Sequence, residues 1–475
     1  MAGIVCYGSY IPRYRLSRSA ITTPMSIGVA AATRGSRSVA SYDEDTTTMG
    51  IEAARRALAG PGVNPRHVYF GTANPAYLER TNATTIHAAL ALDHAGRAVD
   101  LVGSMRAASA AVEFALQEPA QSLVVVADIR TSLPGGQDER DGGDAAAALV
   151  MTGGSGPVVA EHLADAAVTE DFLDRWRLAE DRTARRWEER FGQELYQALG
   201  AQALTSALET CGLSPAQVDH LIVSCANGRA ATQFARSSGV RREAILDDLL
   251  ADIGNTGAAH FGVLLCAALD KAQPGEVIAM VVLADGAQAH VFRVGPLIDE
   301  VRKARRAAVN SASETREVSY TTFLRWREML PVEPPRRPDP GEITAPGMLR
   351  AASWKLDYAG SRCLECDELH FPPQRVCQKC TSVDRMRPQS MAHRSGTVVT
   401  SLTDRITWSP SPPAAFAVVN LDGGGRVECE VTELDGQELR PGDRVELTFR
   451  KLSTTRNGIH NYFWKLRPVR AEGAR

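Results

Sequence analysis

The fold is decided by QSLVVVADI at residues 121–129 and DAAAALVMTG at 144–153, a long apolar strand, a turn and a second strand. The same order returns in EVIAMVVLAD at 276–285 and AQAHVFRVG at 287–295. Runs that are apolar throughout are typical of strands covered by helices on both faces. Because each pair closes about half of residues 1–300, the sequence predicts a duplicated α/β unit.

The rest of this region fits the same layered plan. TTTMGIEAARRAL at 46–58 places its apolar residues on one helical face, with Thr46 or Asp45 as N-cap. The run Asp43-Glu44-Asp45 is interpreted as an exposed acidic cluster that complements the dipole of this helix. Four further segments predict strands: IVCYGS at 4–9, HVYFGT at 67–72, VDLVGS at 99–104 and HLIVSCA at 220–226.

Composition excludes several classes of protein. A chain of 475 residues, 44% hydrophobic, is long enough for two or three domains with cores of their own. A net charge of −3 argues against a protein dominated by binding to a phosphate backbone. No apolar run approaches the ~18 residues of a membrane span. The N-terminus, MAGIVCYGSYIPRYRL, does not read as a signal peptide, so we expect a cytoplasmic protein with no membrane partner.

The pattern changes after residue 300. YTTFLRWREML at 320–330 predicts one amphipathic helix, and six prolines between 331 and 346 predict an extended linker. From about 350 the runs have strand length and are separated by Gly, Asp and Pro turns, which favours a small closed barrel. The expected domains are 1–300 (α/β), 301–349 (helix and linker), 350–385 (metal-binding ribbon) and 386–475 (all-β barrel).

Four of the nine cysteines form two CxxC pairs, Cys363 with Cys366 and Cys377 with Cys380. Two such pairs can close a tetrahedral site with no open coordination position, so they predict a structural zinc ion. The alternative is four free thiols. Clustering of this kind is typical of metal ligation in a reducing compartment.

A zinc ribbon followed by a barrel also occurs in modules that bind single-stranded nucleic acid. Residues 351–475 carry 18 lysines and arginines against 15 aspartates and glutamates, which is too even to favour a polyanion, so no nucleic acid is expected. RCLECDELHFPPQRVCQKC followed by GTVVTSLTD resembles instead the acyl-CoA-associated OB-fold family with a rubredoxin-like zinc ribbon. Members of that family accompany thiolase-type enzymes, as separate subunits or fused to them.

Residues 1–300 resemble the thiolase superfamily, most closely its 3-hydroxy-3-methylglutaryl-CoA synthase branch, with some likeness to type III ketoacyl synthases. The resemblance implies two βαβαβαββ halves in five layers, a homodimer, and a tunnel for the pantetheine arm of a CoA or acyl-carrier thioester. Six segments carry it in the family's order: YDEDTTTMGIEAARRAL (42–58), VDLVGSMRAASAAV (99–112), GGDAAAALVMTG (142–153), HLIVSCANGRA (220–230), IGNTGAAHFG (253–262) and ADGAQAHVF (284–292).

The resemblance also assigns catalytic positions, and three of the four are substituted. The position of the nucleophilic cysteine, at the start of a buried helix, holds Met105, whose thioether forms no acyl-enzyme. The histidine position holds Ser224, and the general-base glutamate position holds Ala73. Only Asn255 of the GNT segment is retained, and with the backbone N–H of residue 105 it would polarise a thioester carbonyl.

Residues next to the substituted positions are candidates to replace the missing catalytic groups. Several of them also have a purely structural interpretation. Ser104 is expected to cap the helix rather than act as nucleophile, and Cys225 to be a buried structural thiol. Glu79 lies six residues beyond Ala73. His260 is either a base near the pocket or a packed histidine.

Four more residues complete the candidate set. Arg106 and Arg229 are candidates for binding CoA phosphates or a substrate carboxylate, or are solvated. Tyr77 and Asp144 lie in motif-like loops that the sequence alone does not place.

Two functions follow from these positions. The first is an atypical acyl-thioester enzyme that forms or breaks a C–C bond, or transfers an acyl group, without a catalytic cysteine. The resemblance makes this reasonable, because thiolase-like aldolases partnered by the same OB-fold family dispense with the cysteine. We expect this enzyme to act in a bacterial secondary-metabolite or acyl-CoA pathway. The second is a catalytically inactive scaffold that binds and supports a complete partner thiolase or ketosynthase.

Overall fold

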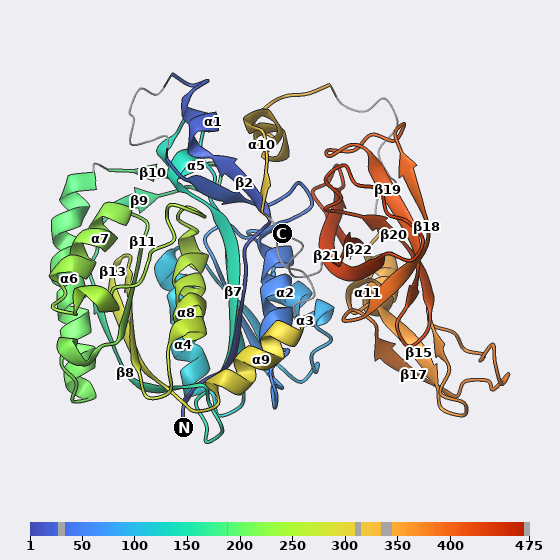
Figure 1. Cartoon of the computed structure of the whole chain (residues 1–475), viewed down its shortest axis with the longest axis horizontal. Coiled ribbons are helices and arrows are strands. Elements are labelled where there is room, and N and C mark those ends of the chain that lie inside the picture. The colour runs from blue at the N-terminus through green and yellow to red at the C-terminus, as the bar shows by residue number, and fades with distance from the viewer. Residues whose placement is uncertain (27–33, 188, 309–314, 334–343, 470–475) are drawn as a thin grey trace.

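The computed structural model describes residues 1–26, 34–187, 189–308, 315–333 and 344–469. Its largest element is a nine-stranded sheet of order β11-β12-β13-β8-β1-β7-β6-β4-β5 (Figure 1). The strands are β1 (Gly3–Tyr10), β4 (His67–Thr72), β5 (Ala98–Val102), β6 (Ser122–Ile129), β7 (Asp144–Thr152), β8 (Ala160–Thr169), β11 (His220–Cys225), β12 (Val277–Leu283) and β13 (Gly286–Val294).

The sheet is built from two related halves. In one half β6 pairs antiparallel with β7 and parallel with β4; in the other β12 pairs antiparallel with β13 and parallel with β11. The repeated strand–turn–strand pattern therefore reports a real duplication. The sequence predicted every strand of this sheet except β8, in which apolar residues alternate with charged ones.

Helices divide this part of the chain into five layers (Figure 1). Helices α4 and α8 lie in the middle, where each contacts strands of both halves. Outside one half, α6 and α7 pack on β8, β11, β12 and β13; outside the other, α2 and α3 pack on β1, β4, β5, β6 and β7, with α9 beside α2. Their bounds are α2 (Thr46–Ala57), α3 (Ala83–Ala89), α4 (Met105–Gln117), α6 (Glu189–Thr210), α7 (Gly228–Ser237), α8 (His260–Lys271) and α9 (Ile298–Ala308).

Shorter elements gather at one end of the layers. They form a three-stranded sheet of order β14-β2-β3, the hairpin β9-β10 and three helices. Helix α10 is shorter than the expected 320–330, because Glu328 adopts a left-handed backbone with φ of 55°. Most of the expected proline-rich linker lies outside the described residues. The bounds are β2 (Tyr14–Ser17), α1 (Arg18–Thr22), β3 (Ser36–Val39), α5 (Gln137–Asp141), β9 (Arg175–Trp176), β10 (Arg185–Arg186), β14 (Arg316–Glu317) and α10 (Tyr320–Trp326).

The C-terminal part is the predicted ribbon and barrel. Helix α11 (Ala345–Leu356) precedes a ribbon of order β16-β15-β17, made of β15 (Ala359–Cys363), β16 (Leu369–His370) and β17 (Met386–Ser390). The closed barrel has the order β18-β19-β20-β22-β21 and is filled by side chains that include Val419, Phe449 and Trp464. Its strands are β18 (Ser395–Asp404), β19 (Ala414–Leu421), β20 (Arg426–Val431), β21 (Arg444–Thr454) and β22 (His460–Pro468).

The acidic run before α2 is buried, which corrects the expectation that it is exposed. Asp43, Glu44 and Asp45 are 0%, 5% and 9% exposed, because the barrel packs on this end of the helix. Asp45 is the N-cap, as expected, and accepts a hydrogen bond from the backbone N–H of Thr48 at 2.9 Å. Its second oxygen accepts from the hydroxyl of Tyr462 at 2.7 Å, so one carboxylate serves the helix and the barrel.

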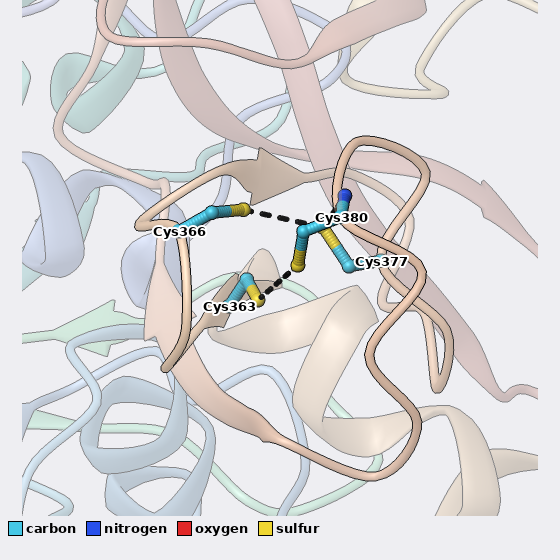
Figure 2. A group of neighbouring side chains, drawn as sticks. All are labelled: Cys363, Cys366, Cys377 and Cys380. Atoms are coloured by element: carbon cyan, nitrogen blue, oxygen red, sulfur yellow. Dashed lines mark hydrogen bonds between the residues drawn. The ribbon is translucent and has the colours of Figure 1, made fainter.

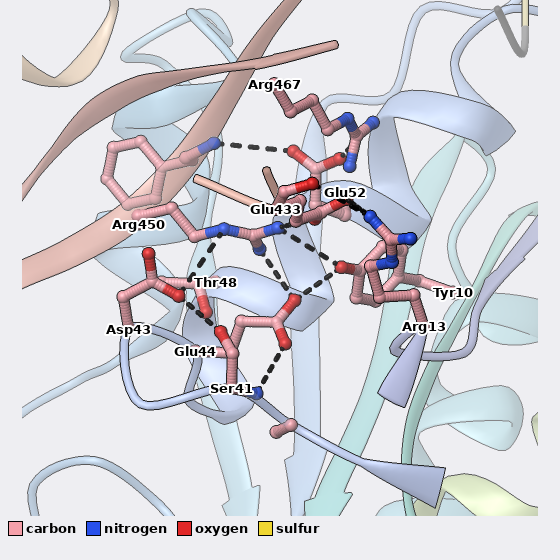
Figure 3. A network of polar contacts seen from close by, with 12 residues as sticks. Tyr10, Arg13, Ser41, Asp43, Glu44, Thr48, Glu52, Glu433, Arg450 and Arg467 are labelled. Atoms are coloured by element: carbon pink, nitrogen blue, oxygen red, sulfur yellow. Dashed lines mark hydrogen bonds and ion pairs between the residues drawn. The ribbon is translucent and has the colours of Figure 1, made fainter. Parts of the chain in front are cut away.

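Arg450 on β21 is the centre of the charge network between barrel and α/β part (Figure 3). Its fully buried guanidinium lies 2.7 Å from Glu44 and 2.6 Å from Glu433. Asp43 lies 3.0 Å from the ammonium of Lys465, and the two cations Lys465 and Arg450 outweigh its burial and lower its pKa. The barrel is therefore held against α2 by paired, desolvated charges.

A second ion pair extends the network along α2. Glu52 lies 3.0 Å from Arg467 of β22, and the charges of Arg467 and Arg55 outweigh burial and lower the pKa of Glu52. Arg55 also donates to the backbone carbonyl of Leu447 at 2.7 Å. Ten of the twelve residues of α2 are buried, so this helix has no wide solvent face.

Within the described residues, no helix combines the length and the hydropathy that a membrane crossing requires.

Candidate active site and cysteine cluster

Two neighbouring cavities open at the carboxyl ends of the central strands. The inner cavity has a volume of about 110 Å³ and is lined by Ala73, Ser104 and Met105, among others. The outer cavity, of about 860 Å³, is lined by Asn255 and by residues of α5 and α7. Arg130 and Ala226 line both, so they form the junction between the two spaces.

Met105 is the first residue of α4, at the wall of the inner cavity. Ser104 is the N-cap of this helix, as expected, and its hydroxyl accepts from the backbone N–H of Ala107 at 3.1 Å. The local sequence thus builds the helix start that would activate a thiol, with a thioether in its place. Cys225, the thiol next to the substituted histidine position Ser224, is buried, and burial raises its pKa to about 12.

Asn255 lines the outer cavity. Its Nδ2 donates to the carbonyl of Cys225 at 2.7 Å, and its Oδ1 accepts from the backbone N–H of Gly257 at 3.0 Å. Both contacts fix the orientation of the amide. An amide nitrogen has two hydrogens, so Nδ2 retains one for a ligand.

Charged side chains surround the inner cavity. Asp128, at the end of β6, is 1% exposed and accepts from the backbone N–H of Ala258 at 2.9 Å. Burial raises the pKa of Asp128, although Arg130 at 3.9 Å opposes the shift. Asp174 accepts from the hydroxyl of Tyr196 at 2.8 Å, and burial raises its pKa also. These carboxyl groups hold or accept a proton more readily than exposed ones.

Arginines dominate the outer cavity. Its wall carries six arginines and two aspartates: Arg18, Arg130, Arg140, Arg186, Arg229, Arg236, Asp138 and Asp141. Asp138 stays ionised because Arg130 and Arg175 outweigh its burial and lower its pKa to about 2. This arrangement attracts an anionic ligand.

The structure places several other candidates away from both cavities. Ser224 is 1% exposed, and its hydroxyl has no partner among the described residues. His260 is 2% exposed, lies 3.2 Å from the hydroxyl of Thr256, and has a pKa lowered by burial to about 4. Glu79 is exposed.

Arg106 donates to the carbonyl of Val168 at 3.3 Å and lines neither cavity, whereas Arg229 lines the outer one. The two residues that the sequence left unplaced have structural contacts. Asp144 pairs with the buried Arg37 at 3.0 Å. The hydroxyl of Tyr77 accepts from the backbone N–H of His460 in the barrel at 2.7 Å.

Sequence reasoning missed Asp128, Arg130 and Asp174. A signal for the first two was present: SLVVVADIR places two charged residues directly after an apolar strand, and the carboxyl ends of such strands form the binding edge of α/β sheets. Asp174 follows β8 in a polar stretch without a comparable signal.

The four cysteines of the two CxxC pairs converge in the ribbon (Figure 2). Their sulfur atoms lie within 4.8 Å of one another, with 3.6 Å between Cys363 and Cys380 and 3.5 Å between Cys366 and Cys377. These separations exceed the ~2.05 Å of a disulfide and match the spacing around a tetrahedral metal with bonds of about 2.3 Å to sulfur.

Each CxxC pair is held in a tight turn. The residues after the second cysteines, Asp367 and Thr381, both adopt left-handed backbone, with φ of 60° and 61°. Ser382 contacts the sulfur of Cys363 at 3.2 Å, and this hydrogen bond lowers the pKa of Cys363 to about 6.

Comparison with known proteins agrees with this geometry. A family model described as 3-oxoacyl-[acyl-carrier-protein (ACP)] synthase III C terminal matches residues 208–293, and one described as ChsH2, C-terminal OB-fold domain, matches residues 391–450. The hydroxymethylglutaryl-CoA synthase of Methanothermobacter thermautotrophicus is 30% identical over 351 residues, covering 70% of this chain and 99% of the relative. That of Methanopyrus kandleri is 28% identical over 343 residues, covering 69% and 97%.

Solved structures show the same fold. MvaS in complex with 3-hydroxy-3-methylglutaryl coenzyme A superposes with a TM-score of 0.59 at 18% identity, covering 71% of this chain and 94% of that chain. The 3-oxoacyl-[acyl-carrier-protein] synthase III from Aquifex aeolicus VF5 superposes with a TM-score of 0.53 at 21% identity, covering 62% and 100%.

The duplicated halves, the central helices and the cavities between them define a thiolase-type protein of the acyl-thioester condensing class. The chain belongs to the hydroxymethylglutaryl-CoA synthase family and carries, in addition, a cysteine ribbon and an OB-fold barrel. Both resemblances found in the sequence are thereby confirmed.

Proposed function

We propose that this protein is an acyl-thioester enzyme that forms or breaks a C–C bond, or transfers an acyl group, without a covalent cysteine intermediate. The observation that carries the proposal is the wall of the inner cavity. There Met105 stands at the start of α4, and Asp128 and Asp174 are carboxyl groups with raised pKa. The described lining residues include no cysteine, while carboxyl groups for proton transfer are present.

The two cavities fit the two ends of a CoA or acyl-carrier thioester. The arginines of the outer cavity, Arg229 included, would bind the phosphates of the CoA or carrier arm. The inner cavity, the smaller of the two at about 110 Å³, suits a short acyl group. A pantetheine arm would pass the junction at Arg130 and Ala226.

The chemistry that these residues support is proton transfer at carbon. The carboxylate of Asp128 takes a proton from the carbon next to the thioester carbonyl, and the electron pair of that C–H bond passes to the carbonyl oxygen as an enolate. Asn255 Nδ2–H and the backbone N–H of residue 105 would stabilise the oxyanion. The enolate carbon then attacks the carbonyl carbon of a second substrate, whose oxygen takes up the proton.

Acylation tests the absence of a covalent intermediate. After incubation with acetyl-CoA, we expect intact-mass and peptide analysis to find no acyl group on the peptide that contains residue 105. Thiol alkylation should leave activity in place, because Cys225 is buried and has a raised pKa. An acylated peptide at residue 105 would contradict the proposal.

The substitution Asn255→Ala distinguishes the enzyme proposal from the scaffold proposal. Loss of one oxyanion donor typically lowers the rate about 10²–10³-fold, so Asn255→Ala should be severe in an enzyme and nearly silent in a scaffold. The measurement is turnover of a confirmed thioester substrate, with CoA binding by calorimetry as a check on folding. Cys225→Ala is the matched control and should retain activity. Full turnover by Asn255→Ala would mean that this pocket is not the active site.

The scaffold function remains the second candidate, because three of the four catalytic positions that the family resemblance assigns are substituted. In that case the protein would bind a partner thiolase or ketosynthase. A catalytically complete partner that co-purifies with this chain, together with a silent Asn255→Ala variant, would support it.

We propose that the cysteine cluster holds one structural zinc ion. Four thiolates close the site, so the ion would stabilise the ribbon and leave no position for substrate.

Purified protein is expected to contain about one zinc per chain at this site, and Cys377→Ser should lose it. The ribbon should then unfold locally while the α/β part keeps its circular dichroism. A ribbon that stays folded without metal would exclude the assignment. Thiolate ligands persist in a reducing compartment, which supports a cytoplasmic location.

We propose that the chain forms a homodimer through residues 1–300. Strand β5 is at the end of the sheet, and Val99 and Val102 on it and Phe114 on α4 are 41%, 42% and 46% exposed. An exposed apolar edge strand favours pairing with a second copy.

Light scattering should find a dimer for the wild type and a 51.1 kDa monomer for Val102→Lys. Leu402→Lys, on an exposed barrel residue, is the control and should stay dimeric; a monomeric wild type at micromolar concentration would refute the dimer.

A further inference from the structure

A β-bulge in β8 brings together two polar residues that an ideal strand would separate. Side chains alternate between faces, so residues three apart, such as His162 and Asp165, point to opposite sides. In the pairing of β13 with β8, Val291 faces Ala164 but Phe292 faces His162, which leaves Leu163 as an extra residue. The bulge restores His162 and Asp165 to one face, and His290 joins them as the direct partner of Asp165.

The three side chains converge at metal-binding distances. The Nε2 of His162 lies 3.5 Å from an oxygen of Asp165 and 3.5 Å from Nδ1 of His290. One ligand atom from each residue lies within 4.8 Å of the others. In a tetrahedral site with bonds of about 2.0–2.2 Å, neighbouring ligand atoms lie about 3.4 Å apart, so the two close pairs already have the required spacing.

Burial and aromatic packing hold the two imidazole rings in place. His290 is fully buried between the strands. Phe292 packs against both rings.

We propose that His162, Asp165 and His290 bind a divalent transition-metal ion of the zinc class. Two imidazoles and one carboxylate are a ligand set for zinc and related ions. The site is separate from the cysteine cluster, and none of its residues lines the inner or outer cavity. Three protein ligands leave a fourth position open, on the side where Asp165 is 44% exposed.

Metal stoichiometry of the full-length protein, without a polyhistidine tag, tests the site. Protein dialysed to equilibrium against micromolar Zn²⁺ should contain one more zinc per chain in the wild type than in His162→Gln or Asp165→Asn. His94→Gln, which changes an exposed histidine on the same domain, is the control and should match the wild type. The comparison is a difference of one equivalent, so it stands whether or not the cysteine cluster binds zinc.

Cobalt distinguishes the two sites by colour. Co²⁺ added to protein that carries one equivalent of zinc, held at the cysteine cluster, should give visible d–d bands without thiolate-to-cobalt charge transfer, and the bands should vanish in Asp165→Asn. If His162→Gln fails to fold by circular dichroism, Asp165→Asn decides alone, because its side chain is partly exposed. Equal zinc in wild type and Asp165→Asn, or cobalt bands that survive this substitution, would overturn the proposal.

Discussion

Arg450→Met is expected to lower the free energy of unfolding by about 3–5 kcal/mol. The substitution removes a fully buried guanidinium that neutralises Glu44 and Glu433, and uncompensated buried carboxylates are strongly destabilising. Burial already raises the pKa of Glu44, and this shift should grow once its cation is gone. Urea denaturation followed by tryptophan fluorescence would measure the loss.

Arg444→Met is the matched control on the same strand. Arg444 pairs with Asp422 at the surface, with side chains 44% and 53% exposed. Exposed pairs of this kind contribute about 0–1 kcal/mol. If both variants lost the same stability, the buried network would not be what holds the barrel against α2.

Asp128→Asn is expected to slow the proposed reaction about 10²–10⁴-fold, the usual contribution of a general base. Asparagine keeps the shape and the acceptor for the backbone N–H of Ala258, but it does not accept a proton from substrate. Burial raises the pKa of Asp128, and only its ionised form is a base. The wild-type rate should therefore rise as pH rises through this raised pKa, and the variant should lose that dependence.

Steady-state rates across the acidic pH range would check this expectation. Asp93→Asn, at an exposed carboxylate of the same domain, should keep both the rate and the pH dependence. If Asp128→Asn kept the acidic limb, Asp174, the second carboxyl group with a raised pKa, would be the base to replace next.

Much of the fold was predictable because its strands are buried on both faces. VIAMVVL of β12 and SLVVVADI of β6 are wholly buried, so their sequences are nearly uniform in polarity. Strands β8 and β22 lack this signal. Glu161, His162 and Asp165 interrupt β8, and β22 carries Lys465 and Arg467, whose charges are buried only because acidic partners lie elsewhere in the chain.

The residues of the candidate site also differ in how far the local sequence predicts them. Met105, Ser104 and the four cysteines follow from local sequence, since a helix start or a CxxC turn needs only neighbouring residues. The prediction that Asp43, Glu44 and Asp45 are exposed was wrong, because these three residues are buried. An acidic run before a helix has the same sequence pattern whether solvent or a neighbouring barrel covers it. The pKa of Asp128 depends on burial by segments far apart in sequence, which no local pattern reports.

The enclosure of α2 bears on how this protein can evolve. An outer helix of a layered fold usually has one solvent-exposed face that tolerates substitution. Helix α2 instead packs against the sheet on one side and against the barrel on the other. At Gly50 an added Cβ would lie 2.8 Å from a methyl of Val125, so even the smallest change meets the sheet. On the other side Glu52 is tied to Arg467. We therefore expect residues 42–57 and the barrel strands β21 and β22 to coevolve, because a substitution in one requires a compensating substitution in the other.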